Sequence, residues 1–127
     1  MRYTILFVVL SWLGTLPSVG VAADVDTDGD DLLRECEKVL NESLPTLEHG
    51  ESFHCIGFVL GLLSMNAIYH RQGTAPLFCP PPTVTVGQGI RVTVTYLQGH
   101  PEKLHEDGGS LAVTALQHAF PCPLKRK

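Results

Sequence analysis

Residues 51–72, ESFHCIGFVLGLLSMNAIYHRQ, present no polar face to water when they are drawn as a helix. Two apolar sets recur at helical spacing on opposite sides: Phe53, Ile56, Leu60, Leu63 and Ala67, and Phe58, Val59, Leu62, Met65 and Ile68. The densest part, residues 55–68, is shorter than the roughly 18 to 20 apolar residues that cross a bilayer, and Asn66 interrupts it. A helix that is apolar all round must be buried, so we predict a buried central helix over residues 51–72.

Residues 1–23 have the organisation of a secretory signal peptide. Arg2 is followed by an apolar run over residues 5–13, and Val21-Ala22-Ala23 resembles a cleavage site. A retained membrane anchor is the weaker interpretation, because the apolar run is short and is followed by Gly14. We therefore predict export to the periplasm, with no stable membrane span after cleavage, and one mature domain over residues 24–127.

About 100 residues build one domain with a modest core, which extra cross-links would help to stabilise. Cysteines in an exported chain of this size indicate two disulfides, and four cysteines allow three pairings: Cys36, Cys55, Cys79 and Cys122. Without Arg2 the chain has eight basic residues against 13 acidic ones, a net charge of about −5. That balance argues against nucleic acid as a partner and favours a basic or neutral protein.

Helical spacing recurs on both sides of the central segment. Residues 32–40 carry one apolar stripe that Asp28, Asp30 or Asp31 can cap, and residues 41–50 break the pattern. Prolines exclude a helix over residues 74–82. A short helix is expected to begin at Pro101, and a last one runs from a Ser110 cap to Phe120. The expected fold is all-α, with four to five helices and two disulfides.

Residues 83–97, TVTVGQGIRVTVTYL, fit two structures. Alternating Val84, Val86, Ile90, Val92, Val94 and Tyr96 favour strands, and two glycines disfavour a helix. A helical stripe also fits, with Thr83 or Thr85 as its cap. Propensity alone favours a hairpin, although two strands are marginally stable by themselves.

Asp24, Asp26 and Asp28, followed by Gly29 and Glu35, match the spacing of a calcium-binding loop. Asp31 replaces the usual apolar residue two places after the glycine, and signal cleavage would leave Asp24 at a terminus. A solvated acidic leader that caps a helix is the favoured interpretation, so no metal site is predicted.

His54 and Cys55 are the residue types of a cysteine hydrolase, but neighbours on a helix point about 100° apart and cannot pair. Cys55 is also expected to be disulfide-bonded. The six histidines contain no pair three or four residues apart on an expected helix, and the chain has no phosphate loop, dinucleotide fingerprint or serine elbow. We therefore predict no catalytic residues and no cofactor.

Several short motifs follow one another along the chain: Cys36, Cys55-x-Gly57-Phe58-x-x-Gly61, Cys79-x-Pro81, Val84-Thr85-x-x-Gln88, Tyr96-Leu97-x-x-His100-Pro101-Glu102-x-Leu104 and Ala115-Leu116-x-x-Ala119-Phe120-Pro121-Cys122. In this order they resemble the Rap/Tai immunity proteins of type VI secretion. Members of that family are small, exported, disulfide-bonded helical proteins, often dimers, that block peptidoglycan amidases injected by rival cells. The resemblance implies a helix over residues 83–97, an amidase effector as partner and a possible homodimer.

The expected helix order favours Cys36–Cys55 and Cys79–Cys122, since these bonds tie the leading helix to the central one and the chain end to the prolines. Effector contacts are expected in a polar loop after the third helix: His100, Glu102, Lys103, His105, Glu106 and Asp107. Two other functions stay open. An exported acid-stress chaperone would expose apolar surface at low pH, and a secreted cysteine hydrolase would need a free thiol at Cys55.

Overall fold

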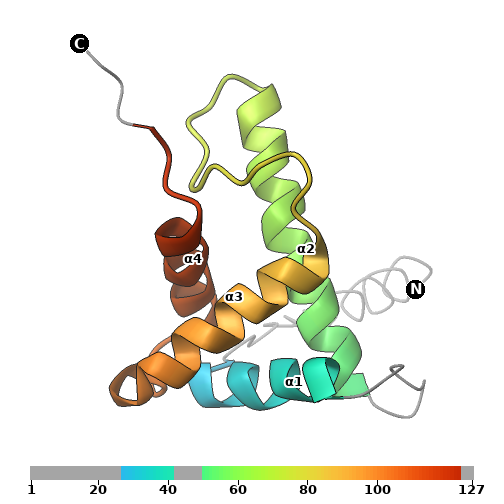
Figure 1. Cartoon of the computed structure of the whole chain (residues 1–127), viewed down its shortest axis with the longest axis vertical. Coiled ribbons are helices and arrows are strands. Elements are labelled where there is room, and N and C mark those ends of the chain that lie inside the picture. The colour runs from blue at the N-terminus through green and yellow to red at the C-terminus, as the bar shows by residue number, and fades with distance from the viewer. Residues whose placement is uncertain (1–26, 42–49, 124–127) are drawn as a thin grey trace, which may run out of the picture.

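The computed structural model describes residues 27–41 and 50–123, which form four α-helices and one short 3₁₀ helix. In order they are α1 (Gly29–Asn41), α2 (Gly50–Arg71), α3 (Val86–Gly99), η2 (Pro101–Lys103) and α4 (Gly108–Ala119) (Figure 1). No strand occurs in this part of the chain, where one isolated bridge joins Asp28 and Asp107. The all-α prediction is confirmed. The signal peptide, Asp24 and Asp26 lie outside the described residues.

The core lies where α1, α3 and α4 meet around the first half of α2. α1 crosses the lower end of α2, while α3 runs diagonally between α2 and α4 (Figure 1). The core side chains are buried and almost all apolar: Leu32, Cys36, Cys55, Val59, Ile90, Val94, Leu97, Leu111, Ala112 and Ala115. The hydrophobic positions of four separate segments therefore converge on one end of the longest helix.

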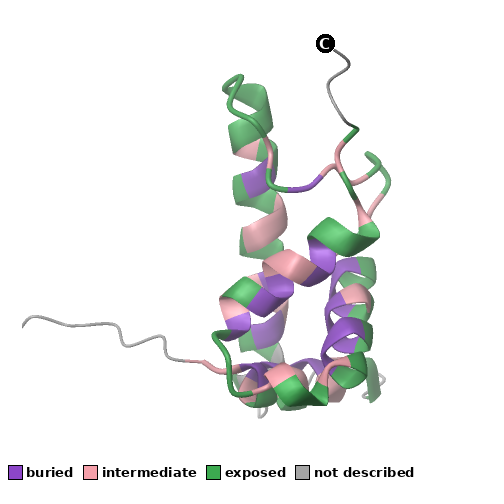
Figure 2. Cartoon of the chain, turned by 90° about the vertical axis from the view of Figure 1, so that its left-hand side faces the viewer, coloured by how far each residue is buried: buried purple, intermediate pink, exposed green. Residues whose placement is uncertain are grey.

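α2 is central, but the prediction that it is buried all round is wrong. Cys55, Val59 and Asn66 are its buried side chains, whereas Phe53 is 43% exposed, Leu60 47% and Met65 48%. At about 1.5 Å per residue α2 is about 33 Å long, whereas α1, α3 and α4 are about 18 to 21 Å long. α1 and α3 cover one stripe of its first half, and the upper half stands away from the shorter helices, mostly exposed (Figure 2).

Among residues 27–41 and 50–123, one helical segment is long and apolar enough to cross a membrane by length and composition, Phe53–Arg71 of α2. Both halves of this segment are tied to the rest of the domain. Cys55 is bonded to α1, and Asn66 binds the segment that follows the helix. These contacts are typical of a helix that belongs to a folded domain.

The ambiguous segment is a helix, as the family resemblance implies, and the hairpin is wrong. Thr85 begins α3 with a capping box, because Gln88 N–H donates to Thr85 Oγ1 at 3.2 Å and Thr85 N–H donates to Gln88 Oε1 at 2.9 Å. Gly89 is explained by packing rather than by a turn. A Cβ there would lie 2.9 Å from Val59 Cγ1, so the missing side chain lets α3 approach α2.

Aspartates cap the first and last helices. Asp28 Oδ1 accepts from Asp31 N–H at 2.9 Å, which makes Asp28 the cap of α1, one of three predicted candidates. The predicted Ser110 cap of α4 is wrong, because Asp107 occupies that position and accepts from Ser110 N–H at 2.7 Å. Gly108 and Gly109 therefore begin α4 instead of ending the preceding loop. A Cβ at Gly108 would lie 2.7 Å from the Thr27 carbonyl oxygen.

Candidate partner-binding surface

Two disulfides hold the four helices in place. Cys36 is bonded to Cys55 with a Cα–Cα distance of 5.2 Å, which joins α1 to the start of α2. Cys79 is bonded to Cys122 at 4.8 Å, which joins the proline-rich connection to the residues after α4. These are the two pairings expected from the helix order.

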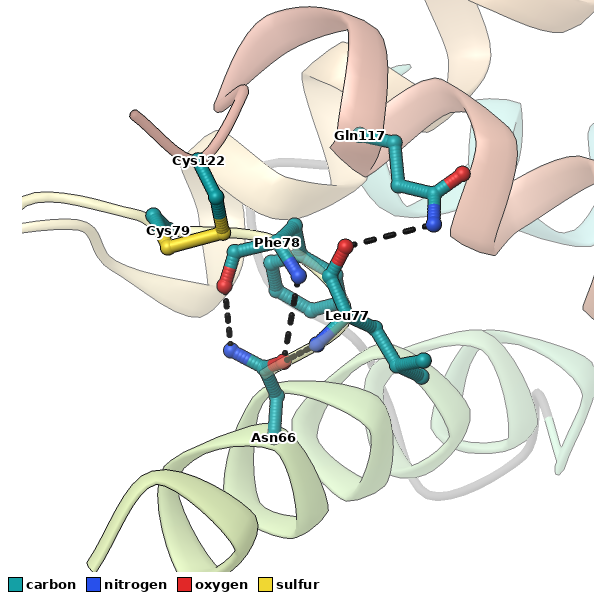
Figure 3. Close-up of a disulfide and its surroundings, with 6 residues drawn as sticks. All are labelled: Asn66, Leu77, Phe78, Cys79, Gln117 and Cys122. Carbon is teal, nitrogen blue, oxygen red and sulfur yellow. Dashed lines mark hydrogen bonds between the residues drawn. A yellow bond between two sulfur atoms is a disulfide. The ribbon is translucent and has the colours of Figure 1, made fainter. Parts of the chain in front are cut away.

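Asn66 fixes the proline-rich connection to the upper half of α2 (Figure 3). Its Nδ2 donates to the Phe78 carbonyl at 2.8 Å, while Oδ1 accepts from Leu77 N–H at 2.8 Å and from Phe78 N–H at 3.3 Å. On the other side, Gln117 Nε2 of α4 donates to the Leu77 carbonyl at 3.2 Å. Asn66 and Phe78 are buried, so α2 and α4 hold this segment between them.

A pocket of about 330 Å³ lies between the upper half of α2 and this connection. Its lining is mostly apolar and includes Leu63, Ala67, Phe78, Pro80 and Val84, with His70 as the titratable member. Asn66 also borders it, but its amide is occupied by the backbone of Leu77 and Phe78. Such a pocket suits an apolar side chain of a partner.

A second surface lies on the far side of α3, where three polar side chains surround the Tyr96 ring. His100 stacks on it with ring centroids 4.1 Å apart, and His118 of α4 meets its edge at 5.5 Å. Lys103 Nζ lies 3.5 Å from the Tyr96 hydroxyl oxygen. We call these four residues the Tyr96 cluster. It borders a shallow groove of about 490 Å³ between α3 and α4, the α3–α4 groove, which Arg91 also lines.

The structure separates the six predicted effector-contact residues by role. His100 and Lys103 join the Tyr96 cluster, and Glu102, His105 and Glu106 are exposed. Asp107 has a structural role as the cap of α4. The side-chain and backbone hydrogen bonds from Ser110 lower the pKa of its carboxyl below the ordinary value.

This loop is held by backbone contacts to the start of α1. Gly29 N–H donates to the Glu106 carbonyl at 3.0 Å, and Gly108 N–H donates to the Thr27 carbonyl at 2.9 Å. Asp30 N–H donates to the Leu104 carbonyl at 3.1 Å. The loop is therefore held in a fixed position and exposes its side chains at one end of the bundle.

The cysteine-hydrolase interpretation is contradicted, because Cys55 is buried and disulfide-bonded and the described residues contain no free cysteine. His54 Nδ1 lies 2.5 Å from Glu35 Oε2, so this histidine pairs with α1 rather than with a nucleophile. Within the described part of the chain, no group of three or more His, Cys, Asp or Glu residues is placed to hold a metal ion. Of the calcium-loop pattern, Asp28 caps α1 and Glu35 contacts His54.

The family model of the Rap1a immunity proteins matches residues 28–122. The chain belongs to the Rap1a immunity protein family. No curated protein and no solved structure matches it. The matched region runs from the cap of α1 to Cys122, so the Rap1a match includes all four α-helices and both disulfides.

Two features of this Rap1a protein were missed in the sequence. Asn66 interrupts the apolar pattern of residues 55–68, but its side chain is buried and bonded to the proline-rich connection; the sequence signal is a lone amide in an apolar helix that prolines follow. The histidines are not all scattered, because Tyr96 and His100 are four residues apart and their rings stack. His118 joins them through the packing of α4 on α3, which no local pattern indicates.

Proposed function

We propose that this Rap1a-family protein is an exported immunity protein that binds and blocks a type VI secretion peptidoglycan amidase, without catalysis of its own. The observation that carries the proposal is the family match over residues 28–122. An immunity protein acts as an inhibitor, and an inhibitor needs a surface rather than an active site.

Export to the periplasm is the second element of the proposal. The leader at residues 1–23 has the pattern of a signal peptide, and both disulfides are typical of proteins that fold in an oxidising compartment. Peptidoglycan is cut in the same compartment. A protector placed there meets the amidase before the cell wall is damaged.

The described domain has the rigidity that tight inhibition requires. Surfaces that are ordered before binding lose less conformational entropy on contact. The Cys79–Cys122 disulfide and the Asn66 hydrogen bonds fix the proline-rich connection, the Cys36–Cys55 disulfide joins α1 to α2, and backbone bonds to α1 fix the loop after α3. We propose that the effector contacts this loop through His100, Glu102, Lys103, His105 and Glu106. Asp107 stabilises the end of the loop as the cap of α4.

A homodimer is the third element, and the exposed side of α2 supports it. Phe53 and Leu60 are exposed there, and a Cβ added at Gly57 or Gly61 would meet no atom within 4 Å. With Ser64, these five residues form the outer face of α2, which has no charged side chain. Small residues let two helices approach closely, and a neutral face avoids repulsion between two acidic copies. Analytical ultracentrifugation of wild type and of Leu60→Glu measures the oligomeric state. If the outer face of α2 forms the interface, wild type should be dimeric and the variant monomeric.

The functional test is to co-express the exported protein with the amidase encoded beside its gene. We expect a purified complex, loss of amidase activity and protection from lysis. A Cys79→Ala/Cys122→Ala variant, which leaves the proline-rich connection less constrained, should protect less well. If no complex forms and lysis is unchanged, the immunity function is wrong. Suppression of client aggregation at low pH, through the exposed side of α2, would then support the chaperone alternative.

A further inference from the structure

Charge is distributed unevenly over this acidic protein. α1 carries four acidic residues, Asp30, Asp31, Glu35 and Glu37, whereas neither α3 nor α4 contains an aspartate or glutamate. The charged residue within α3 is Arg91, and α4 adds His118. α3 and α4 themselves therefore contribute no negative charge to the surface where they lie side by side, and the carboxylate that reaches α3 from α1 is that of Glu37, which accepts from Gln98 Nε2 at 2.7 Å.

The basic groups converge on one place rather than spreading over this surface. Arg91, His100 and His118 all line the α3–α4 groove, and Lys103 lies against the Tyr96 hydroxyl. Arg91 and His118 are exposed, and none of their described contacts involves a carboxylate. His100 Nδ1 lies 2.7 Å from the Tyr96 carbonyl oxygen, which holds its ring against Tyr96.

Part of the groove lining is apolar. Val92, Ala115 and Ala119 line it, and the alanines leave room that larger residues of α4 would fill. A ligand with a short aliphatic stem and an anionic end fits this combination. The stem would lie on the alanines while the anionic end meets Arg91 and the histidines. Aspartate and glutamate side chains have this form.

We propose that the α3–α4 groove and the Tyr96 cluster bind a carboxylate side chain of the amidase effector. The inference rests on the proposed function and names the contact that would position the effector on this face. Arg91 provides a positive charge and His118 provides an exposed imidazole that can donate a hydrogen bond. Tyr96 holds the His100 ring by stacking, so fewer rotamers of that side chain are lost on binding.

This placement extends the contacts expected from the sequence. His100 belongs both to the predicted loop and to the groove, and Lys103 of the loop lies beside the groove at the Tyr96 hydroxyl, so an effector that covers the loop also reaches Arg91 and His118. An acidic residue of the effector meets no acidic residue of α3 or α4 here. The same residue placed on α1 would face Asp30, Asp31 or Glu35 and be repelled.

The test uses the catalytically inactive form of the amidase encoded beside the gene. A carbodiimide forms an amide between a lysine and a carboxylate in direct contact, so peptide mapping of the treated complex should find Lys103 joined to an effector aspartate or glutamate. Arg91→Glu and His118→Glu should each weaken binding about tenfold, with a smaller loss at high salt. Arg91→Gln should weaken it less than Arg91→Glu.

Arg71→Glu is the matched control, because Arg71 is exposed at the last turn of α2, outside the groove, and its reversal changes net charge equally. Its affinity should stay within twofold of wild type, and thermal melting should show that every variant folds. If wild type binds but the groove variants bind equally well and Lys103 is not linked, the groove proposal is overturned while the immunity function stands. Equal weakening of binding by Arg71→Glu would also overturn the groove proposal, because the effect would then come from the net charge of the protein and not from the groove. If wild type does not bind the amidase, both proposals fail.

Discussion

Replacing Asn66 by alanine tests whether its side chain fixes the proline-rich connection. The change removes three hydrogen bonds, to the Phe78 carbonyl, Leu77 N–H and Phe78 N–H. Each is worth about 1 kcal/mol net, and more where a buried backbone group is left without a partner. Since Asn66 is only 4% exposed, water cannot replace these bonds without opening the segment. We expect a loss of about 3 kcal/mol in the free energy of unfolding.

Urea unfolding of the oxidised protein measures this loss of free energy. In a thermal melt, the Asn66→Ala variant of a domain of this size should unfold about 12 °C or more below wild type. Thr93→Val is the matched control. Thr93 is fully buried, and its hydroxyl donates to the Gly89 carbonyl of its own helix at 3.0 Å. Removing that hydroxyl leaves a helical carbonyl that retains a backbone partner, so we expect a change below about 1 kcal/mol.

Amide hydrogen exchange distinguishes local opening from global unfolding. In Asn66→Ala the amides of Leu77 and Phe78 should exchange faster, while the amide of Cys79 keeps its 2.8 Å bond to the Phe120 carbonyl. If Asn66→Ala unfolds within about 0.5 kcal/mol of wild type, with unchanged protection of Leu77 and Phe78, the assigned role of Asn66 is wrong.

Three further predictions concern stability. Gly89→Ala should destabilise the protein by about 1 kcal/mol, since the 2.9 Å clash with a core side chain outweighs the gain in helix propensity; Gly87→Ala, where the added Cβ would meet Thr85 Oγ1 at 3.9 Å, should not destabilise it in the same urea assay. Removing Cys79 and Cys122 together should cost about 4 kcal/mol, because their bond closes a loop with a sequence separation of 43 residues; an unchanged urea midpoint would refute the chain-entropy argument. Asp107→Ala should cost about 1 kcal/mol at pH 7 as a lost helix cap. Because the folded pKa of this carboxyl is lowered, its contribution is present above about pH 4 and is lost as pH falls through the folded pKa, so the gap between wild type and variant should close in acid unfolding curves.

Sequence patterns leave residues 83–97 undecided and misplace the cap of α4. Residues 83–97 satisfy both the strand and the helix period, and the helix is favoured by the Thr85 capping box and by the close approach of Gly89 to Val59 of α2. Ser110 is a good cap by type. Asp107 takes that position because Gly108 must pass close to the Thr27 and Asp28 carbonyls, where a side chain would not fit.

The helical class, the number of disulfides and the resemblance to an immunity family can be inferred from the sequence alone. They rest on helical spacing, on the number of cysteines and on the order of short motifs, which a linear pattern records. Which side of α2 is covered depends on its neighbours in three dimensions, because burial is set by how many helices pack against it and how long they are. The same holds for the meeting of His100 and His118 at Tyr96, since α4 reaches α3 only through packing. The surfaces on which the proposed function depends are therefore products of long-range contacts, whereas the elements that carry them are local.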